Sequence, residues 1–66
     1  MENYEIRLVR RQGQSVVYAS TYLSDYAAVR GARMMAGSDD GIEIWRGMHC
    51  IYRDGSEAVQ ARAMGL

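Results

Sequence analysis

The side chains that could do chemistry in this chain are few and lie next to each other. His49 is the single histidine and Cys50 the single cysteine, in a segment with strand composition. A thiol within hydrogen-bond distance of an imidazole would form a nucleophile–base pair. Because neighbouring side chains of a strand point to opposite faces, this order does not bring the two groups together. We therefore expect no cysteine–histidine catalytic pair.

The remaining polar clusters are explained by turns. Asp39 and Asp40 form a carboxylate pair, but they stand in the segment GSDDG, and turns favour aspartate and glycine. One histidine and one cysteine cannot supply a tetrahedral metal site, and no acidic loop has the length of a calcium site. The glycines do not combine into a phosphate-binding loop. The sequence therefore predicts no enzyme, no cofactor and no metal.

The composition indicates one small globular domain. A chain of 66 residues buries only about 60% of its unfolded surface, so the core must be thin or completed by a second copy. The apolar fraction of 48% is ordinary for a globular chain. A single cysteine forms no internal disulfide. Neither a signal peptide nor an apolar segment of membrane-spanning length is visible, so we expect a cytoplasmic protein without a membrane partner.

Residues 24–37 have the features of a complete helix. Ser24 can cap the amides of the first turn, where the charge of Asp25 is also favourable. Small and apolar residues recur with the spacing of one helical face, namely Ala28, Val29, Ala32, Met35 and Ala36. We expect Gly37 to end the helix in a left-handed conformation. Gly31 indicates either a close approach to a sheet or a tolerated glycine.

The segments on both sides of this helix have strand patterns. Residues 4–11 alternate apolar and polar side chains, and residues 15–21 are rich in β-branched and aromatic ones, which predicts a hairpin. Residues 42–45 and 48–52 predict a second hairpin. The expected fold class is α+β, a small two-layer ββαββ domain with one helix packed on an antiparallel sheet, a mixed sheet being the alternative.

The domain boundary follows from the same patterns. Residues 1–55 contain all the predicted strands and the capped helix. Residues 56–66 have helical composition, but a helix of this length is marginal in water unless something binds its apolar side. We therefore expect a single domain over residues 1–55 and a frayed or partly helical tail over residues 56–66.

The register of the second hairpin decides which side chains face the helix. A two-residue loop opposes Ile44 to His49 and would bury the imidazole. A three-residue loop opposes Ile44 to Cys50, and turns Trp45, His49 and Ile51 to the other face. We favour the three-residue loop, because a neutral thiol costs less to bury than an imidazole.

The segment GIEIWRGMHCIYR, which follows an Ala- and Arg-rich helix, resembles the ending of a group of short uncharacterised alphaproteobacterial proteins. Their ending has the order apolar, Glu, apolar, Trp, a turn glycine, then an apolar strand closed by Arg. The matching positions are Ile42, Glu43, Ile44, Trp45, Gly47, Ile51 and Arg53. His49 stands where that pattern has a basic residue, usually Arg. The resemblance covers residues 4–53, and it implies a compact ββαββ unit of unknown function without catalytic residues to transfer.

The sheet face that the helix leaves open is the expected binding surface. On it we expect apolar side chains among charges, in a candidate surface made of Arg7, Val9, Trp45, His49, Ile51 and Arg53. Such patches, with Trp and Arg, are typical of protein interfaces. The predicted function is a non-enzymatic protein–protein interaction module or homodimer, which meets its partner at this face or along an edge strand. A solvated face, or one covered by residues 56–66, is the alternative.

Nucleic-acid binding is the second predicted function. The arginines Arg7, Arg10, Arg11 and Arg53, with Tyr and Trp interleaved, could contact phosphates and stack on bases. However, eight basic residues stand against eight acidic ones, and this zero net charge gives no overall attraction to nucleic acid. We therefore rank a nucleic-acid partner below a protein partner.

Overall fold

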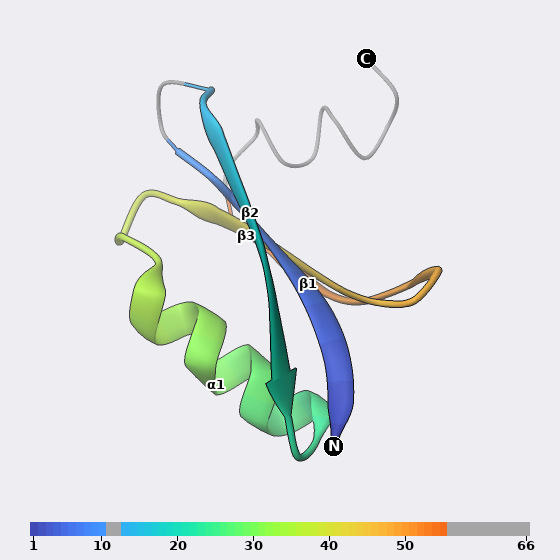
Figure 1. Cartoon of the computed structure of the whole chain (residues 1–66). Helices are drawn as coiled ribbons and strands as arrows, with labels where there is room; N and C mark the ends of the chain where they lie inside the picture. The colour runs from blue at the N-terminus through green and yellow to red at the C-terminus, as the bar shows by residue number, and fades with distance from the viewer. Residues whose placement is uncertain (11–12, 56–66) are drawn as a thin grey trace.

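In the computed structural model, which describes residues 1–10 and 13–55, one helix separates two strand hairpins (Figure 1). The elements are β1 (Glu2–Val9), β2 (Ser15–Tyr22), α1 (Asp25–Met35), β3 (Gly41–Arg46) and β4 (His49–Asp54). The predicted tail over residues 56–66 lies outside the described residues, as does Arg11.

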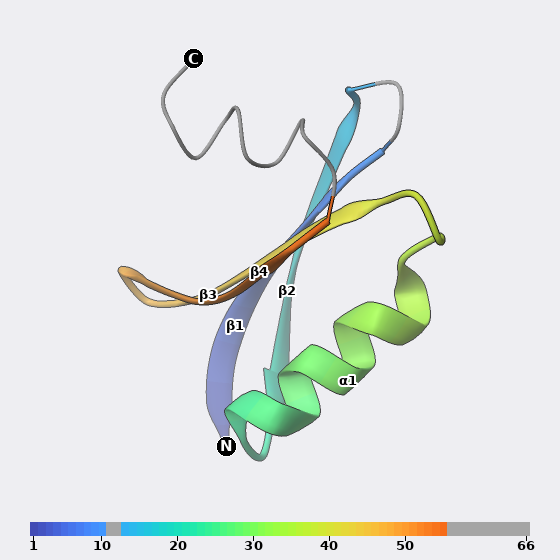
Figure 2. The same ribbon diagram turned by 180° about the vertical axis from the view of Figure 1, so that it is seen from behind.

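The four strands form one antiparallel sheet in the order β2-β1-β3-β4. The chain makes the first hairpin, passes through α1, and returns beside β1 on the side away from β2. The helix lies across one face of the twisted sheet, as Figures 1 and 2 show from opposite sides. This confirms the predicted α+β class and ββαββ order. The sheet is purely antiparallel, so the mixed alternative is wrong.

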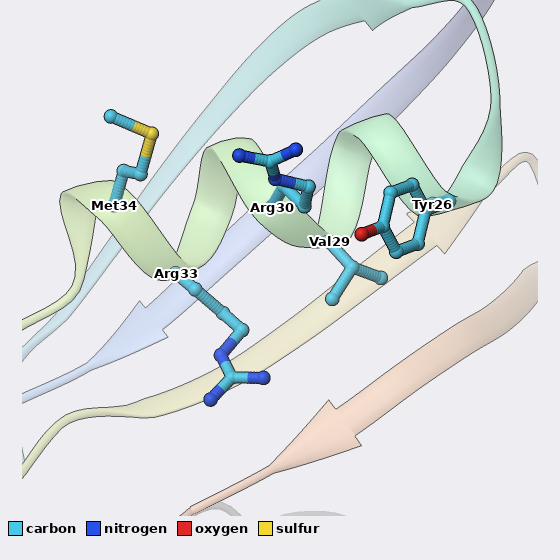
Figure 3. A pocket seen from close by; sticks show the side chains of 5 residues that line it. All are labelled: Tyr26, Val29, Arg30, Arg33 and Met34. Carbon is cyan, nitrogen blue, oxygen red and sulfur yellow. The ribbon is translucent and has the colours of Figure 1, made fainter.

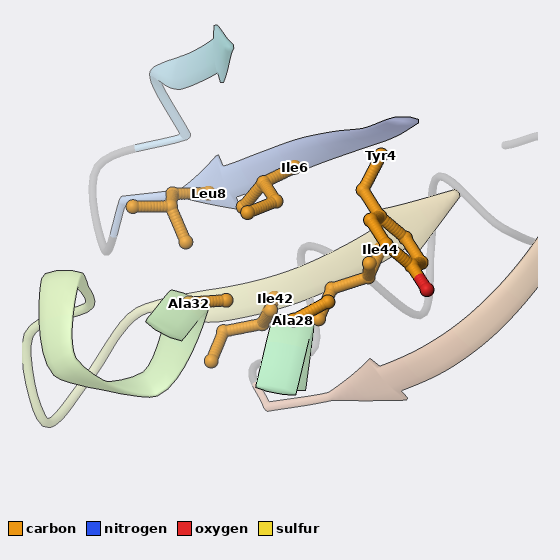
Figure 4. Close-up of a cluster of buried hydrophobic side chains, with 7 residues drawn as sticks. All are labelled: Tyr4, Ile6, Leu8, Ala28, Ala32, Ile42 and Ile44. Atoms are coloured by element: carbon orange, nitrogen blue, oxygen red, sulfur yellow. The ribbon is translucent and has the colours of Figure 1, made fainter. Parts of the chain in front are cut away.

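The hydrophobic core lies between α1 and the two inner strands (Figure 4). It contains the buried side chains of Tyr4, Ile6, Leu8, Ala28, Ala32, Ile42 and Ile44. The two buried helix residues are alanines, which lets the helix backbone approach the sheet. Fully burying one large aliphatic side chain contributes roughly 1.5–3 kcal/mol, so this face of the sheet supplies most of the folding free energy.

At Gly31 the helix lies close to β2. A Cβ atom added at this position would lie 2.5 Å from the hydroxyl oxygen of Tyr22. The Tyr22 ring in turn packs against Tyr4, with ring centroids 6.0 Å apart. Of the two interpretations of Gly31, the close approach is therefore correct.

The N-terminus of α1 forms as the sequence predicts. The Ser24 hydroxyl accepts a hydrogen bond from the Ala27 amide at 3.1 Å. Asp25, in the first turn, also connects the helix to the sheet. Its carboxylate accepts a hydrogen bond from the Tyr4 hydroxyl at 2.6 Å and pairs with the Arg46 guanidinium at 2.7 Å. The bond to Asp25 raises the pKa of Tyr4, because it stabilises the protonated phenol.

The predicted end of the helix is wrong in its mechanism. Gly37 is not among the glycines with positive φ, and the cap residue Ala36 is extended, with φ −79° and ψ 145°. Instead, the Asp40 carboxylate accepts a hydrogen bond from the Gly37 amide at 2.8 Å and also pairs with Arg10. Because a side chain satisfies this amide, the helix ends without a left-handed residue.

Both predicted registers of the second hairpin are also wrong. Arg46 lies opposite His49, so the two-residue loop consists of Gly47 and Met48. Gly47 has φ +61°, in the left-handed region that glycine adopts at little cost. The loop therefore forms one residue later than the shorter of the two predicted loops, at the residue best suited to it.

A β-bulge then changes which residues of β4 face the helix. Trp45 lies opposite Cys50, but the register shifts between Ile44 and Trp45, and Ile44 lies opposite Tyr52. The extra residue is Ile51, and both Ile51 and Tyr52 pack against the core. Cys50 is half-buried beside Trp45 on the other face, so the expectation that Cys50 enters the core is wrong.

Candidate functional site

The sheet face opposite α1, here called the open face, carries a row of charged side chains across three strands. Arg7 of β1 lies opposite Glu43 of β3, and Glu43 lies opposite Arg53 of β4. Glu5 and Trp45 are opposed one step further along the strands. Oppositely charged residues facing each other across strands stabilise their pairing, so this row follows from the alternation of each strand and from the register.

Glu43, which is only 4% exposed, lies at the centre of this row. Its carboxylate accepts a hydrogen bond from the indole N–H of Trp45 at 2.9 Å. The same oxygen lies 3.7 Å from Nη1 of Arg7, and the other oxygen lies 3.5 Å from Nε of Arg53. A buried carboxylate needs such partners to offset its desolvation. Glu43 therefore holds three side chains in one arrangement.

Trp45 is held at two points, at its N–H group and on one face of its ring. Its N–H is bound to Glu43, and the Arg7 guanidinium lies 5.1 Å from the centroid of its ring. Arg7 is itself held by Glu5, with Nε 2.5 Å from a carboxylate oxygen. The indole is partly buried and keeps some exposed surface. The open face thus presents an aromatic ring of defined orientation beside two partly exposed guanidinium groups.

The structure brings together three of the six residues in the predicted surface, Arg7, Trp45 and Arg53. Val9 lies on the same face but is fully buried, so it offers no contact area. Glu43 was left out of the predicted surface. The signal for it was present, since strand alternation places it on the same face as Trp45.

The other two predicted residues lie elsewhere. His49 is exposed beside the hairpin loop and opposite Arg46, whose side chain reaches the helix. Ile51 packs against the core because of the bulge. The Cys50 thiol lies 3.4 Å from the carbonyl oxygen of Tyr52. His49 and Cys50 are opposed to different residues that belong to opposite faces, as expected for neighbours in a strand.

Within residues 1–10 and 13–55, no three His, Cys, Asp or Glu side chains come close enough together to hold a metal ion. In the same residues, no helix has the length and apolar character needed to cross a membrane.

The outer surface of α1 carries a shallow pocket of about 360 Å³ (Figure 3). Its lining comes from Tyr26, Val29, Arg30, Arg33 and Met34, all on this one helix. The Arg30 guanidinium lies 5.9 Å from the centroid of the Tyr26 ring. Among the residues that the structure describes, the pocket is therefore a hollow between side chains of a single element, with no group from a second one.

The outer edge of β2 is the third notable surface. In the described part of the chain β2 pairs only with β1, so its other edge is open. Its sequence, SVVYASTY, contains no charged residue, no proline and no glycine. Val16 and Val17 are 40% and 54% exposed. Such an edge is a template for pairing with another strand.

Comparison with known proteins adds no relative. No protein-family model matches the chain, and no curated protein or solved structure gives a significant match. The resemblance to short alphaproteobacterial proteins therefore stays a prediction.

Proposed function

We propose that this chain is a small non-enzymatic protein–protein interaction module that contacts its partner through the open face around Trp45. The observation that carries the proposal is the fixed and partly exposed indole, bonded to Glu43 and covered on one side by Arg7. Tryptophan, tyrosine and arginine are the residues most enriched in interface hot spots. A side chain that is already ordered before binding loses less conformational entropy when the partner arrives.

The charges of this face indicate what kind of partner it suits. Glu5 and Glu43 balance Arg7 and Arg53 within the row, so the face has no excess of one sign. Each guanidinium has five N–H donors and uses only part of them on carboxylates. The fitting partner offers an apolar group for the indole, with hydrogen-bond acceptors such as carbonyl or carboxylate oxygens around it.

Capture of partners from cell extract, with paired variants, tests this proposal. Immobilised wild-type chain, Trp45→Ala and Tyr26→Ala are compared by quantitative mass spectrometry. Tyr26 is the matched control, because it is an exposed aromatic residue on the helix, away from the open face. We expect a protein that the wild type and Tyr26→Ala retain and that Trp45→Ala loses.

The same partner, once purified, gives the quantitative form of the test. Loss of a central tryptophan anchor typically costs at least about 2 kcal/mol of binding, which is roughly a thirtyfold rise in Kd. Calorimetry with both variants measures this change, and circular dichroism checks that each variant is folded. Equal affinity of the wild type and Trp45→Ala for every captured protein would refute the proposal.

Nucleic-acid binding ranks below this function. Arg7 and Arg53 pair with Glu43, and Arg10 pairs with Asp40, so these cations already have carboxylate partners. Arg11 lies outside the described residues. Titration with a fluorescent single-stranded oligonucleotide at low salt gives the strongest phosphate contacts that this surface could make. We expect no saturable binding there. The cytoplasmic location stays a prediction from the sequence.

A further inference from the structure

We propose that two copies of this chain pair through the outer edges of their β2 strands, joining two four-stranded sheets into one continuous sheet. This inference goes beyond the proposed function, because it concerns the edge of the sheet and not the open face. The occupant of the edge is a second copy of the chain.

The two edges of the sheet differ in how they are protected. Natural proteins keep edge strands from pairing with charges, prolines, bulges or short length. The β4 edge has three of these features: the charged Arg53 and Asp54, a bulge and only six residues. The β2 edge is eight residues long and contains no charged residue, no proline and no bulge. An uncharged strand also meets no like charge when it pairs with itself.

Symmetry restricts how β2 can pair with itself. Two antiparallel copies of one edge strand are related by a two-fold axis perpendicular to the sheet, so both helices lie on the same side. Residues opposite each other in an antiparallel pair share a face of the sheet. Because successive residues alternate between faces, the axis must pass beside a residue that lies opposite its own symmetry mate. The central choices are Tyr18 and Ala19.

The register centred on Ala19 gives the better side-chain pairs. It places Val16 opposite Tyr22 on the helix side and Val17 opposite Thr21 on the open face. Aromatic with β-branched and β-branched with β-branched residues are favourable cross-strand neighbours. The register centred on Tyr18 would instead place Val16 opposite Ser20. The small side chain of Ala19 also leaves room at the axis.

This dimer has a consequence for the open face. Since both helices lie on one side, the open faces of the two copies are continuous on the other side. Two Trp45 surfaces are then displayed by one particle, which raises the avidity for a partner that carries repeated sites.

Disulfide trapping tests the pairing and its register together. In a Cys50→Ser background, Ala19→Cys places the new thiol beside its own symmetry mate. The two Cα atoms are then about 4.5–5.5 Å apart, the spacing of opposed residues in antiparallel strands, which a disulfide can bridge. Thr21→Cys is the matched control. It lies on the same face, but its mate is four residues away along the strand, about 13 Å. Under mild oxidation we expect a covalent dimer of Ala19→Cys only. Failure of Ala19→Cys to cross-link, or equal cross-linking of Thr21→Cys, would overturn the inference.

Sedimentation equilibrium provides the thermodynamic test. Ala19→Lys puts two ammonium groups opposite each other at the axis, whereas within one chain the lysine lies opposite Glu5, which favours folding. We expect the wild type to dimerise at micromolar concentrations and Ala19→Lys to raise the dimer dissociation constant at least tenfold. Trp45→Ala should leave dimerisation unchanged, so this result and that of the partner-binding test are separable. A monomeric wild type at high concentration, or unchanged dimerisation of Ala19→Lys, would refute the pairing.

Discussion

The two faces of the sheet are built from alternate residues of the same strands, yet they have opposite chemistry. On the side of α1, Ile6, Leu8 and Ile44 are almost completely buried against small helix residues. On the open face, the neighbouring residue Glu43 binds Trp45 and lies between two arginines. A shift of one residue along β3 therefore separates the centre of the core from the centre of the charged row.

The two faces contribute different amounts to the free energy of folding. Apolar burial gives roughly 1.5–3 kcal/mol for each large side chain and, unlike a hydrogen bond, has no preferred direction. Partly exposed ion pairs contribute about 0–1 kcal/mol each, and a buried carboxylate uses much of its pairing energy to offset desolvation. The covered face therefore holds the fold together, whereas the open face fixes the orientation of a few side chains. Three predictions test this contrast, from the largest effect to the smallest.

Removing bulk from the covered face should be the most damaging change. Ile44→Ala deletes part of a fully buried side chain that β3 contributes to the core under α1, and we expect a loss of about 2–5 kcal/mol in the free energy of unfolding. A 66-residue domain has only about 3–10 kcal/mol in total, so this loss is a large fraction of its stability.

Urea denaturation followed by circular dichroism measures this loss. Ile44→Val, which removes one methyl group, is the matched control, with an expected loss of about 0.5–1.5 kcal/mol. Equal stability of Ile44→Ala and the wild type would contradict the assignment of the folding free energy to the covered face.

On the open face, Glu43→Gln should have a smaller effect. The amide can still accept the indole hydrogen bond, but the charge that holds Arg7 and Arg53 is lost. We expect a loss of about 1–3 kcal/mol, the range for a buried hydrogen-bonded charge that loses its interactions. Glu5→Gln is the control, because the Glu5 side chain is 43% exposed, and its loss should stay within about 0.5 kcal/mol.

Tryptophan fluorescence reports the local part of this effect. Trp45 is the single tryptophan, so the width and position of its emission follow the order and exposure of the indole alone. Glu43→Gln should shift the emission to longer wavelength, whereas Glu5→Gln should leave it nearly unchanged. An identical response of the two variants would show that Glu43 does not hold the indole.

The contrast between the faces also explains what the sequence could predict. The order of elements, the Ser24 cap and the apolar alternation of β1 depend on local spacing, and the structure confirms each of them. The sequence has no comparable local signal for the bulge in the second hairpin. That bulge moves Ile51 to the core and leaves Cys50 beside Trp45.

The placement of the candidate site residues could also be predicted where it depended on local spacing, and could not where it depended on the hairpin register. Arg7 could be assigned to the open face from alternation in its strand. The faces of His49, Ile51 and Arg53 depend on where the second hairpin turns, because a single inserted residue exchanges the faces of β4. Of these three, Arg53 alone lies in the charged row of the open face. The prediction for the end of α1 is wrong because it also depends on a residue outside the local pattern. The Gly37 amide donates to the Asp40 carboxylate, and Gly37 does not adopt the left-handed conformation expected from the sequence.

The smallest predicted effect tests how closely the helix lies on the covered face. Gly31→Ala should gain about 1 kcal/mol from helix propensity, but its new Cβ would lie 2.5 Å from the Tyr22 hydroxyl oxygen. Displacing the end of that ring costs about 1–3 kcal/mol, so we expect a net loss of about 1 kcal/mol.

In a Tyr22→Ala background the obstacle is absent, and Gly31→Ala should stabilise the chain by about 1 kcal/mol. This double-mutant cycle is measured by urea denaturation at a concentration too low for dimers, because Tyr22 also lies in the β2 edge. The same effect of Gly31→Ala in both backgrounds would mean that the helix can move away from β2, and that the covered face tolerates looser packing than its buried alanines indicate.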